Sequence, residues 1–151
     1  MSTDGKETRL YPTRPYLAVS AAIFRDGRVL IVRRAAPPAP GLYTLPGGGV
    51  ELGETLVEAV IREVGEETGL AIAPVALAGY REVIRRDGQG RIERHFVILP
   101  FAARWLSGEV ALNEELAAAH WMNPAELAGL NTTEGLIEIV AAAQKRMAAC
   151  R

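Results

Sequence analysis

The stretch from Pro46 to Leu70, PGGGVELGETLVEAVIREVGEETGL, constrains the fold of this chain more than any other. Its three successive glycines weaken a regular helix, whereas Thr55 and Glu58 form the capping box that starts one. Gly69 is suited to end that helix. The sequence therefore predicts a glycine loop followed by a helix over residues 55–68. The apolar side chains expected to face a sheet are Leu56, Val57, Val60, Ile61 and Val64.

Three glutamates share one face of the predicted helix. Glu63, Glu66 and Glu67 are spaced by three and four residues, so they project within an arc of roughly 100°. Their repulsion costs roughly 0.2–0.5 kcal/mol per exposed pair, and more when they are desolvated. A hard cation such as Mg²⁺ or Mn²⁺ would offset that cost, and the flexible run Gly47–Gly49 can turn a carbonyl toward it. The alternative is an ordinary solvated helix face.

The rest of the chain alternates strand and helix patterns. Two hairpins are predicted around the turns Asp26-Gly27 and Asp87-Gly88-Gln89-Gly90. The expected strands are Tyr16–Phe24 and Arg28–Val32 for the first hairpin, and Val75–Arg85 and Arg91–Trp105 for the second. The proline-rich segment Arg33–Gly49 is predicted to be a loop.

Two helices are predicted near the end of the sequence. Asn123-Pro124 begins a short helix, because Asn caps helices and Pro is tolerated in the first turn. Thr132 or Thr133 is predicted to cap a final amphipathic helix that ends near Ala149.

Length and charge limit the expected partners. The chain has 151 residues, a net charge of −1 and one cysteine, Cys150. This length fits one domain over residues 1–151, with residues 1–14 flexible or loosely attached. The near-zero charge gives no general attraction to nucleic acid or to an anionic membrane, so neither is an expected partner. Unpaired cysteine and the lack of a long apolar segment favour a cytoplasmic location.

A known family carries the same acidic pattern. Gly48, five residues, Glu54, seven residues and then the run Arg62–Leu70 (REVGEETGL) match every position of the Nudix box. The chain therefore resembles the Nudix hydrolases. The resemblance implies an α/β (α+β) fold, in which a mixed β-sheet lies between helices in an α/β/α sandwich.

The resemblance also implies roles for particular residues. Glu63, Glu66 and Glu67 are expected to bind the metal, Mg²⁺ or alternatively Mn²⁺, with the Gly47 carbonyl as a further ligand. Glu54 and Arg62 are expected to support the catalytic glutamates. An acidic residue on a later loop is expected to take part, and Glu115 is the first candidate, with Glu114 as its rival. The general base is either Glu63 or Glu115.

The implied activity is hydrolysis of a phosphoanhydride in a small nucleoside diphosphate derivative. ADP-ribose or a related nucleotide sugar is the first expectation, and cleansing of oxidised dNTPs is the alternative. A proline that marks some ADP-ribose enzymes is missing, because Arg85 and Arg86 occupy its positions. A nucleotide-sensing module without catalysis is the alternative of another class. Homodimers are common among relatives, so a homodimer is left open.

Candidate residues for the substrate come from the same region. Arg33 and Arg34 are the preferred phosphate contacts, since the guanidinium presents forked donors. Tyr43 is a candidate for stacking on a base, although packing beneath the glycine loop is the alternative. Gly48 is expected to let phosphate approach the backbone closely. Arg81 and Arg85 are further candidates, against the alternative of solvated arginines on an edge strand.

Overall fold

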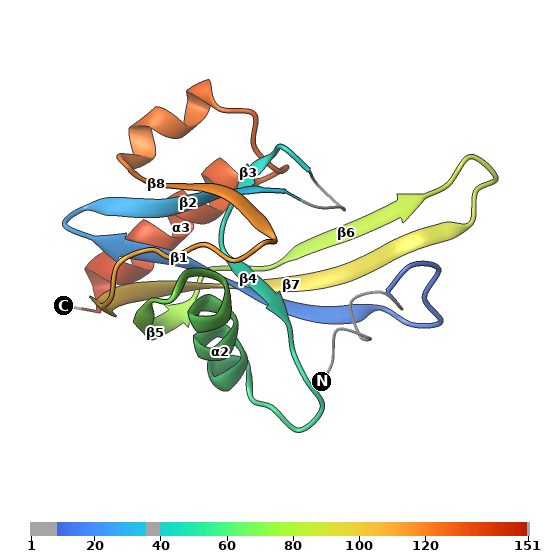
Figure 1. Cartoon of the computed structure of the whole chain (residues 1–151), viewed down its shortest axis with the longest axis horizontal. Coiled ribbons are helices and arrows are strands. Elements are labelled where there is room, and N and C mark those ends of the chain that lie inside the picture. Colours follow the sequence, from blue (N-terminus) through green and yellow to red (C-terminus); the bar gives the residue numbers. More distant parts are fainter. Residues whose placement is uncertain (1–8, 36–39, 151) are drawn as a thin grey trace.

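The computed structural model describes residues 9–35 and 40–150 of the chain (Figure 1). The strands are β1 (Tyr16–Arg25), β2 (Arg28–Arg34), β3 (Tyr43–Thr44), β4 (Gly47–Gly49), β5 (Ala71–Leu77), β6 (Arg81–Arg86), β7 (Ile92–Ser107) and β8 (Leu116–Met122). The helices are α2 (Leu56–Thr68), the 3₁₀ helix η1 (Pro124–Gly129) and α3 (Leu136–Ala149).

The strands form one mixed sheet. Its central path runs β3-β2-β1-β7-β5, while β4 pairs with β1, β6 with β7 and β8 with β2. The pairing of β1 with β7 is parallel and the others are antiparallel. The predicted hairpin between β1 and β2 is confirmed, and both Asp26 (φ 51°) and Gly27 (φ 78°) adopt the positive φ angles of its tight turn.

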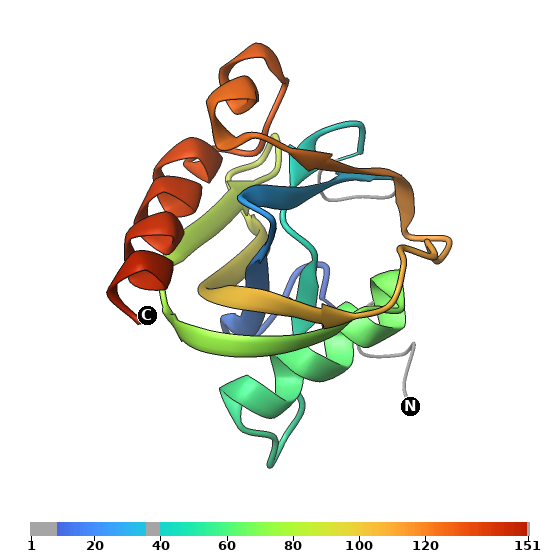
Figure 2. The ribbon, with the colours of Figure 1, turned by 90° about the vertical axis from the view of Figure 1, so that its left-hand side faces the viewer.

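Two hydrophobic cores lie on the two faces of the sheet. Alternate residues of β1 and β2 point to opposite faces, so Ile23 and Leu30 enter one core while Ala22 and Ile31 enter the other. Helix α2 packs on the first core and α3 on the second. Figure 2 shows these two helices on different sides of the strands. The predicted α/β/α sandwich with a mixed sheet is therefore confirmed.

The predicted start and end of α2 are confirmed, but its predicted buried stripe is partly wrong. Val57 and Ile61 are 45% and 43% exposed, whereas Glu63 and Glu67 are 5% and 1% exposed. The helix is rotated so that two carboxylates face inward toward β4. This orientation requires polar partners for both carboxylates, and they are described below.

Three strand predictions also need correction. The segment Arg33–Gly49 is not all loop, because β2 continues through Arg34, and β3 and β4 lie within it. The expected strand Val75–Arg85 is two strands, separated near Gly79, whose φ of 126° suits only glycine. Strand β8 was not predicted, because its sequence LAAAHWM is rich in alanine, a weak strand former.

The C-terminal helices follow the predictions except at one cap. Asn123 caps η1 through a capping box, as predicted. Helix α3 ends at Ala149, but its N-cap is Gly135 and no side chain caps it. The Thr133 hydroxyl instead donates to Thr44 Oγ1 at 3.0 Å, which ties the approach to α3 to strand β3.

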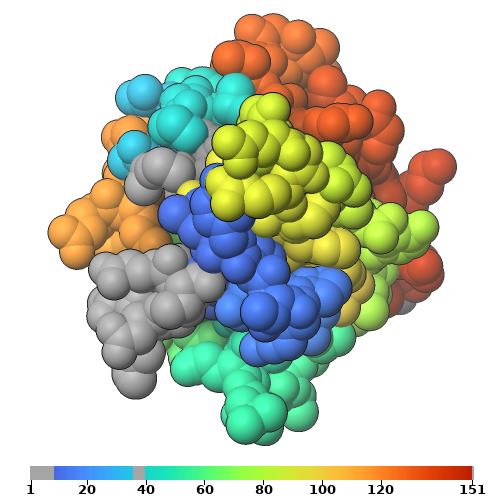
Figure 3. All heavy atoms as spheres, turned by 90° about the vertical axis from the view of Figure 1, so that its right-hand side faces the viewer, coloured from blue at the N-terminus to red at the C-terminus, as the bar shows by residue number. Residues whose placement is uncertain are grey.

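The first described residues lie against the long hairpin of β6 and β7. The Tyr11 amide donates to the Glu93 carbonyl at 2.8 Å, and its hydroxyl donates to Asp87 at 3.0 Å. Figure 3 shows this segment beside the hairpin. The part of the predicted loose segment that precedes Arg9 lies outside the described residues. No described helix is long and apolar enough to span a membrane.

Candidate active site

Close backbone packing brings the glycine strand β4 against α2. A Cβ atom at Gly48 would overlap the Glu63 carboxylate, and one at Gly47 would overlap the Val19 carbonyl oxygen. Neither glycine is needed for a positive φ angle. Their role is close approach, since β4 pairs with β1 on one side and contacts the inward face of α2 on the other.

Arg62 connects the residues around the glycine strand. Its guanidinium holds Glu54 in a bidentate pair, with Nε to Oε2 at 2.6 Å and Nη2 to Oε1 at 2.9 Å. It also donates to Glu63 at 2.9 Å, to Glu66 at 3.2 Å and to the Gly49 carbonyl at 2.9 Å. The Arg62 hydrogen bonds are the main cause of the lowered pKa of Glu54. One guanidinium thus fixes three glutamates relative to β4.

Glu67 is the most deeply buried acid of the site. Its Oε1 accepts a hydrogen bond from the Gly47 amide at 3.0 Å, and Oε2 lies 3.5 Å from Arg34. Burial raises the pKa of Glu67 to about 7, although Arg34 and the Gly47 amide favour its charged form. The neighbouring carboxylates of Glu115 and Glu63 raise this pKa further. Glu67 therefore sits among like charges in a poorly solvated position.

A loop after β7 brings Glu115 to this region. The Ala111 amide donates to the Thr68 carbonyl at 2.7 Å, and the Asn113 amide donates to the Glu67 carbonyl at 3.2 Å. These bonds satisfy carbonyls at the end of α2, which have no partner within the helix. Of the two rival acids, Glu115 is half-buried and acts on the pKa of Glu67, whereas Glu114 is exposed.

The acidic residues offer the oxygen donors that a hard divalent cation prefers. In the described part of the chain, however, no three His, Cys, Asp or Glu side chains converge closely enough to hold an ion as they stand. Glu63 and Glu66 are turned to Arg62, and Glu67 is turned to the Gly47 amide and Arg34. The set fits such a cation in donor type, burial and mutual repulsion, and the Glu66 side chain, which Arg62 contacts at 3.2 Å, is 57% exposed.

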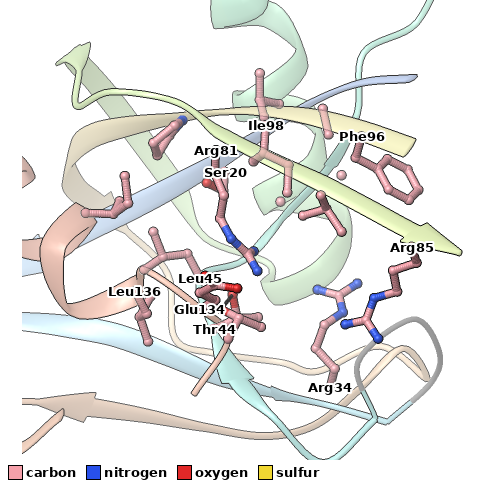
Figure 4. A pocket seen from close by; sticks show the side chains of 18 of the residues that line it. Ser20, Arg34, Thr44, Leu45, Arg81, Arg85, Phe96, Ile98, Glu134 and Leu136 are labelled. Atoms are coloured by element: carbon pink, nitrogen blue, oxygen red, sulfur yellow. Dashed lines mark hydrogen bonds between the residues drawn. The ribbon is translucent and has the colours of Figure 1, made fainter. Parts of the chain in front are cut away.

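A cavity of about 190 Å³ opens beside Gly47 and Gly48. Its lining includes Arg34, Arg81 and Arg85, which point into it from β2 and β6 (Figure 4). Four of the six candidate substrate residues, Arg34, Gly48, Arg81 and Arg85, therefore line the cavity.

The other two predicted substrate residues do not line it. Arg33 precedes Arg34 on β2, where the pairing with β8 shifts its register, and it is not part of the cavity lining. Tyr43 packs with the second core, and its ring centroid lies 6.1 Å from that of His120. Arg9, which also lines the cavity, was missed because it belongs to the segment predicted to be loose. Arg81 and Arg85, the further candidates on the edge strand, both line the cavity, because residues four apart share one face of a strand.

Known proteins share this fold and sequence. The family model of the NUDIX domain matches residues 14–143. The chain is 36% identical over 120 residues to the ADP-ribose pyrophosphatase of Methanocaldococcus jannaschii, covering 80% of this chain and 68% of that protein. It is 35% identical over 117 residues to the nucleoside triphosphatase NudI of Salmonella agona, covering 73% of this chain and 83% of that protein.

A solved structure of a Nudix hydrolase also resembles this chain. The MutT NUDIX hydrolase from Burkholderia pseudomallei matches with a TM-score of 0.75 at 30% identity, over 85% of this chain and 98% of that chain. The sheet between two helices and these matches define a hydrolase of phosphorus-containing acid anhydrides. The chain belongs to the Nudix hydrolase family, whose members generally use divalent metal ions.

Proposed function

We propose that this protein is a divalent-metal-dependent pyrophosphohydrolase of nucleoside diphosphates joined to another group, with ADP-ribose or a related nucleotide sugar as substrate. The observation that carries the proposal is the inward rotation of α2, which buries Glu63 and Glu67 against β4 at the edge of an arginine-lined cavity. Buried carboxylates are costly unless they are paired or bind a cation. This arrangement supports a site for metal and phosphate.

The metal would be held by the carboxylates of Glu63, Glu66 and Glu67, with the Gly47 carbonyl as a further ligand. When bound, Mg²⁺ or Mn²⁺ neutralises the anionic oxygens of a phosphoanhydride and lowers the pKa of water. Mg²⁺ is the first expectation, because it prefers carboxylate oxygen together with substrate phosphate.

The residues of the chain then supply orientation and proton transfer. Arg62 fixes the rotamers of Glu54 and Glu63 through its forked donors, so that the acids keep one geometry. Either Glu63 or Glu115 accepts the proton of the attacking water. Arg34 lines the cavity and lies 3.5 Å from Glu67, which supports a role for it in pairing with a phosphate bound between them.

The substrate class is supported by the relatives. A protein named ADP-ribose pyrophosphatase shares 36% identity with this chain, which favours ADP-ribose. A protein named nucleoside triphosphatase shares 35% identity, so hydrolysis of normal or oxidised dNTPs is the alternative. Retention of every box carboxylate argues against a sensing module that binds nucleotide without cutting it.

A panel assay tests the proposal. ADP-ribose, sugar nucleotides, diadenosine polyphosphates and normal and oxidised dNTPs are incubated with the protein and Mg²⁺, and the products are identified by chromatography. We expect ADP-ribose to yield AMP and ribose 5-phosphate, and EDTA to stop the reaction.

Two variants complete this assay. Glu67→Gln is expected to lose most turnover while it keeps a cooperative melt, whereas Glu138→Gln removes the same charge from the exposed face of α3 and keeps full activity. Retained activity in Glu67→Gln would refute the assignment of the metal site.

A further inference from the structure

The cavity beside β4 concentrates positive charge. Of the residues that the structure describes, four arginines line it, Arg9, Arg34, Arg81 and Arg85, together with one carboxylate, Glu134. The chain as a whole has a net charge of −1, so this excess is local. A cavity with such an excess attracts an anionic ligand.

Two of these arginines lack a close counter-charge among the described residues. Arg34 already lies 3.5 Å from Glu67. By contrast, among residues 9–35 and 40–150 no carboxylate lies within 4 Å of the guanidinium of Arg81 or Arg85. Glu134 acts on Arg81 only from a longer range. The positive charge of β6 is thus left available to a ligand.

Arg81 differs from an ordinary solvated arginine. Its side chain is half-buried, and desolvation by that burial is the main cause of its lowered pKa. Val83 and Ile98 add apolar surface to the same cavity lining, and Ile98 is the residue paired with Arg81 across the sheet. A charge held in such surroundings interacts more strongly with a bound anion than one on an open surface.

We propose that Arg81 and Arg85 bind a terminal phosphate of the substrate, in addition to the phosphoanhydride that is cleaved at the glutamates. The guanidiniums project from the same face of β6 toward Arg34 (Figure 4), and forked donors suit the oxygens of a phosphate dianion. Unmodified ADP-ribose has no such group. A phosphate on the ribose of an ADP-ribose derivative and the end of a nucleoside triphosphate both provide one.

This inference rests on the proposed function for the position of the bond that is cleaved. The affinity of Arg81 and Arg85 for a terminal phosphate does not depend on that function. Edge-strand arginines also serve to prevent aggregation through the unpaired edge. That structural role predicts no selectivity among ligands. Discrimination between compounds that differ by one terminal phosphate therefore separates the two roles.

The experiment compares two pairs of compounds that differ by one phosphate. The first pair is ADP-ribose and its 2′-phosphate, and the second is dGDP and dGTP. Dissociation constants are measured by calorimetry in EDTA, where no turnover occurs, and kcat/KM is measured separately in Mg²⁺. The variants are Arg81→Gln and Arg85→Gln. Arg86→Gln is the control, because Arg86 lies on the same strand outside the cavity lining and contacts Gly90.

The expected result is at least about tenfold tighter binding of the phosphorylated member in one pair, consistent with charge-assisted hydrogen bonds. Arg85→Gln should reduce this ratio about tenfold, and Arg86→Gln should preserve it. The pair that shows the preference identifies the source of the phosphate. Equal affinities within both pairs, or a preference unchanged in both cavity variants, would overturn the inference.

Absence of turnover with Mg²⁺ and Mn²⁺ would instead contradict the proposed function. The binding ratios in EDTA would still decide the role of the arginines.

Discussion

The buried carboxylate of Glu67 should make the stability of the metal-free protein depend on pH in a defined direction. The pKa of this group is raised from 4.5 to about 7 in the folded state, mainly by burial. The folded protein therefore holds a proton that the unfolded chain releases near pH 4.5. The stability associated with this proton is fully present below pH 4.5 and is lost as the pH rises through 7.

The size of the effect follows from the difference between the two pKa values. One pKa unit corresponds to about 1.36 kcal/mol, so the shift from 4.5 to about 7 amounts to about 3 kcal/mol. The Glu67 side chain is only 2% exposed, so solvent screening reduces this little. The variant Glu67→Gln cannot titrate at this position. Relative to that variant, the wild-type protein should lose about 3 kcal/mol between pH 4.5 and pH 7.5.

The assay is urea unfolding in EDTA, followed by the fluorescence of Trp105 and Trp121, at several pH values for both proteins. Saturating Mg²⁺ should restore the wild-type stability at pH 7.5 and leave Glu67→Gln unchanged, because ligand binding to the native state stabilises it. Curves of unfolding free energy against pH that run parallel for the two proteins would refute the reasoning. They would mean that Glu67 titrates alike in the folded and unfolded states.

Four further substitutions test the structure. Arg62→Lys should reduce kcat/KM about 10- to 100-fold with little change in the melting curve, because an ammonium cannot hold Glu54 and β4 together; activity within twofold of wild type would contradict this. Thr55→Ala should cost about 1 kcal/mol and lower Tm by about 2–4 °C through loss of the helix cap, while turnover is kept. An unchanged Tm would disprove the capping contribution. Val60→Ala should cost about 2 kcal/mol, whereas Ile61→Ala should stay within about 0.5 kcal/mol, as urea unfolding would show. Equal costs would contradict the orientation of α2.

Features encoded by a few neighbouring residues could be predicted from the sequence. The capping box of Thr55, the end of α2 at Gly69 and the tight turn at Asp26-Gly27 depend on local backbone conformations, and all were confirmed. The acidic motif was also sufficient to identify the family.

Features that depend on distant partners could not be predicted in the same way. Apolar spacing suggested that Ile61 is buried, but the helix instead buries Glu67, because the Gly47 amide and Arg34 supply polar partners from other elements. Strand β4 forms only because β1 offers a ladder for three glycines. The convergence of Arg34 and Arg85 likewise requires the pairing of β1 with β7 and of β7 with β6.

The central claim is that the buried glutamates of α2 bind a divalent cation that promotes hydrolysis of a diphosphate link. The most direct measurement is ³¹P NMR of ADP-ribose incubated with the protein, first in EDTA and then in excess Mg²⁺. We predict a stable diphosphate signal in EDTA and its replacement by two phosphomonoester signals after Mg²⁺ is added. A diphosphate signal that persists with Mg²⁺ and with Mn²⁺, for ADP-ribose and every other compound of the panel, would contradict the account.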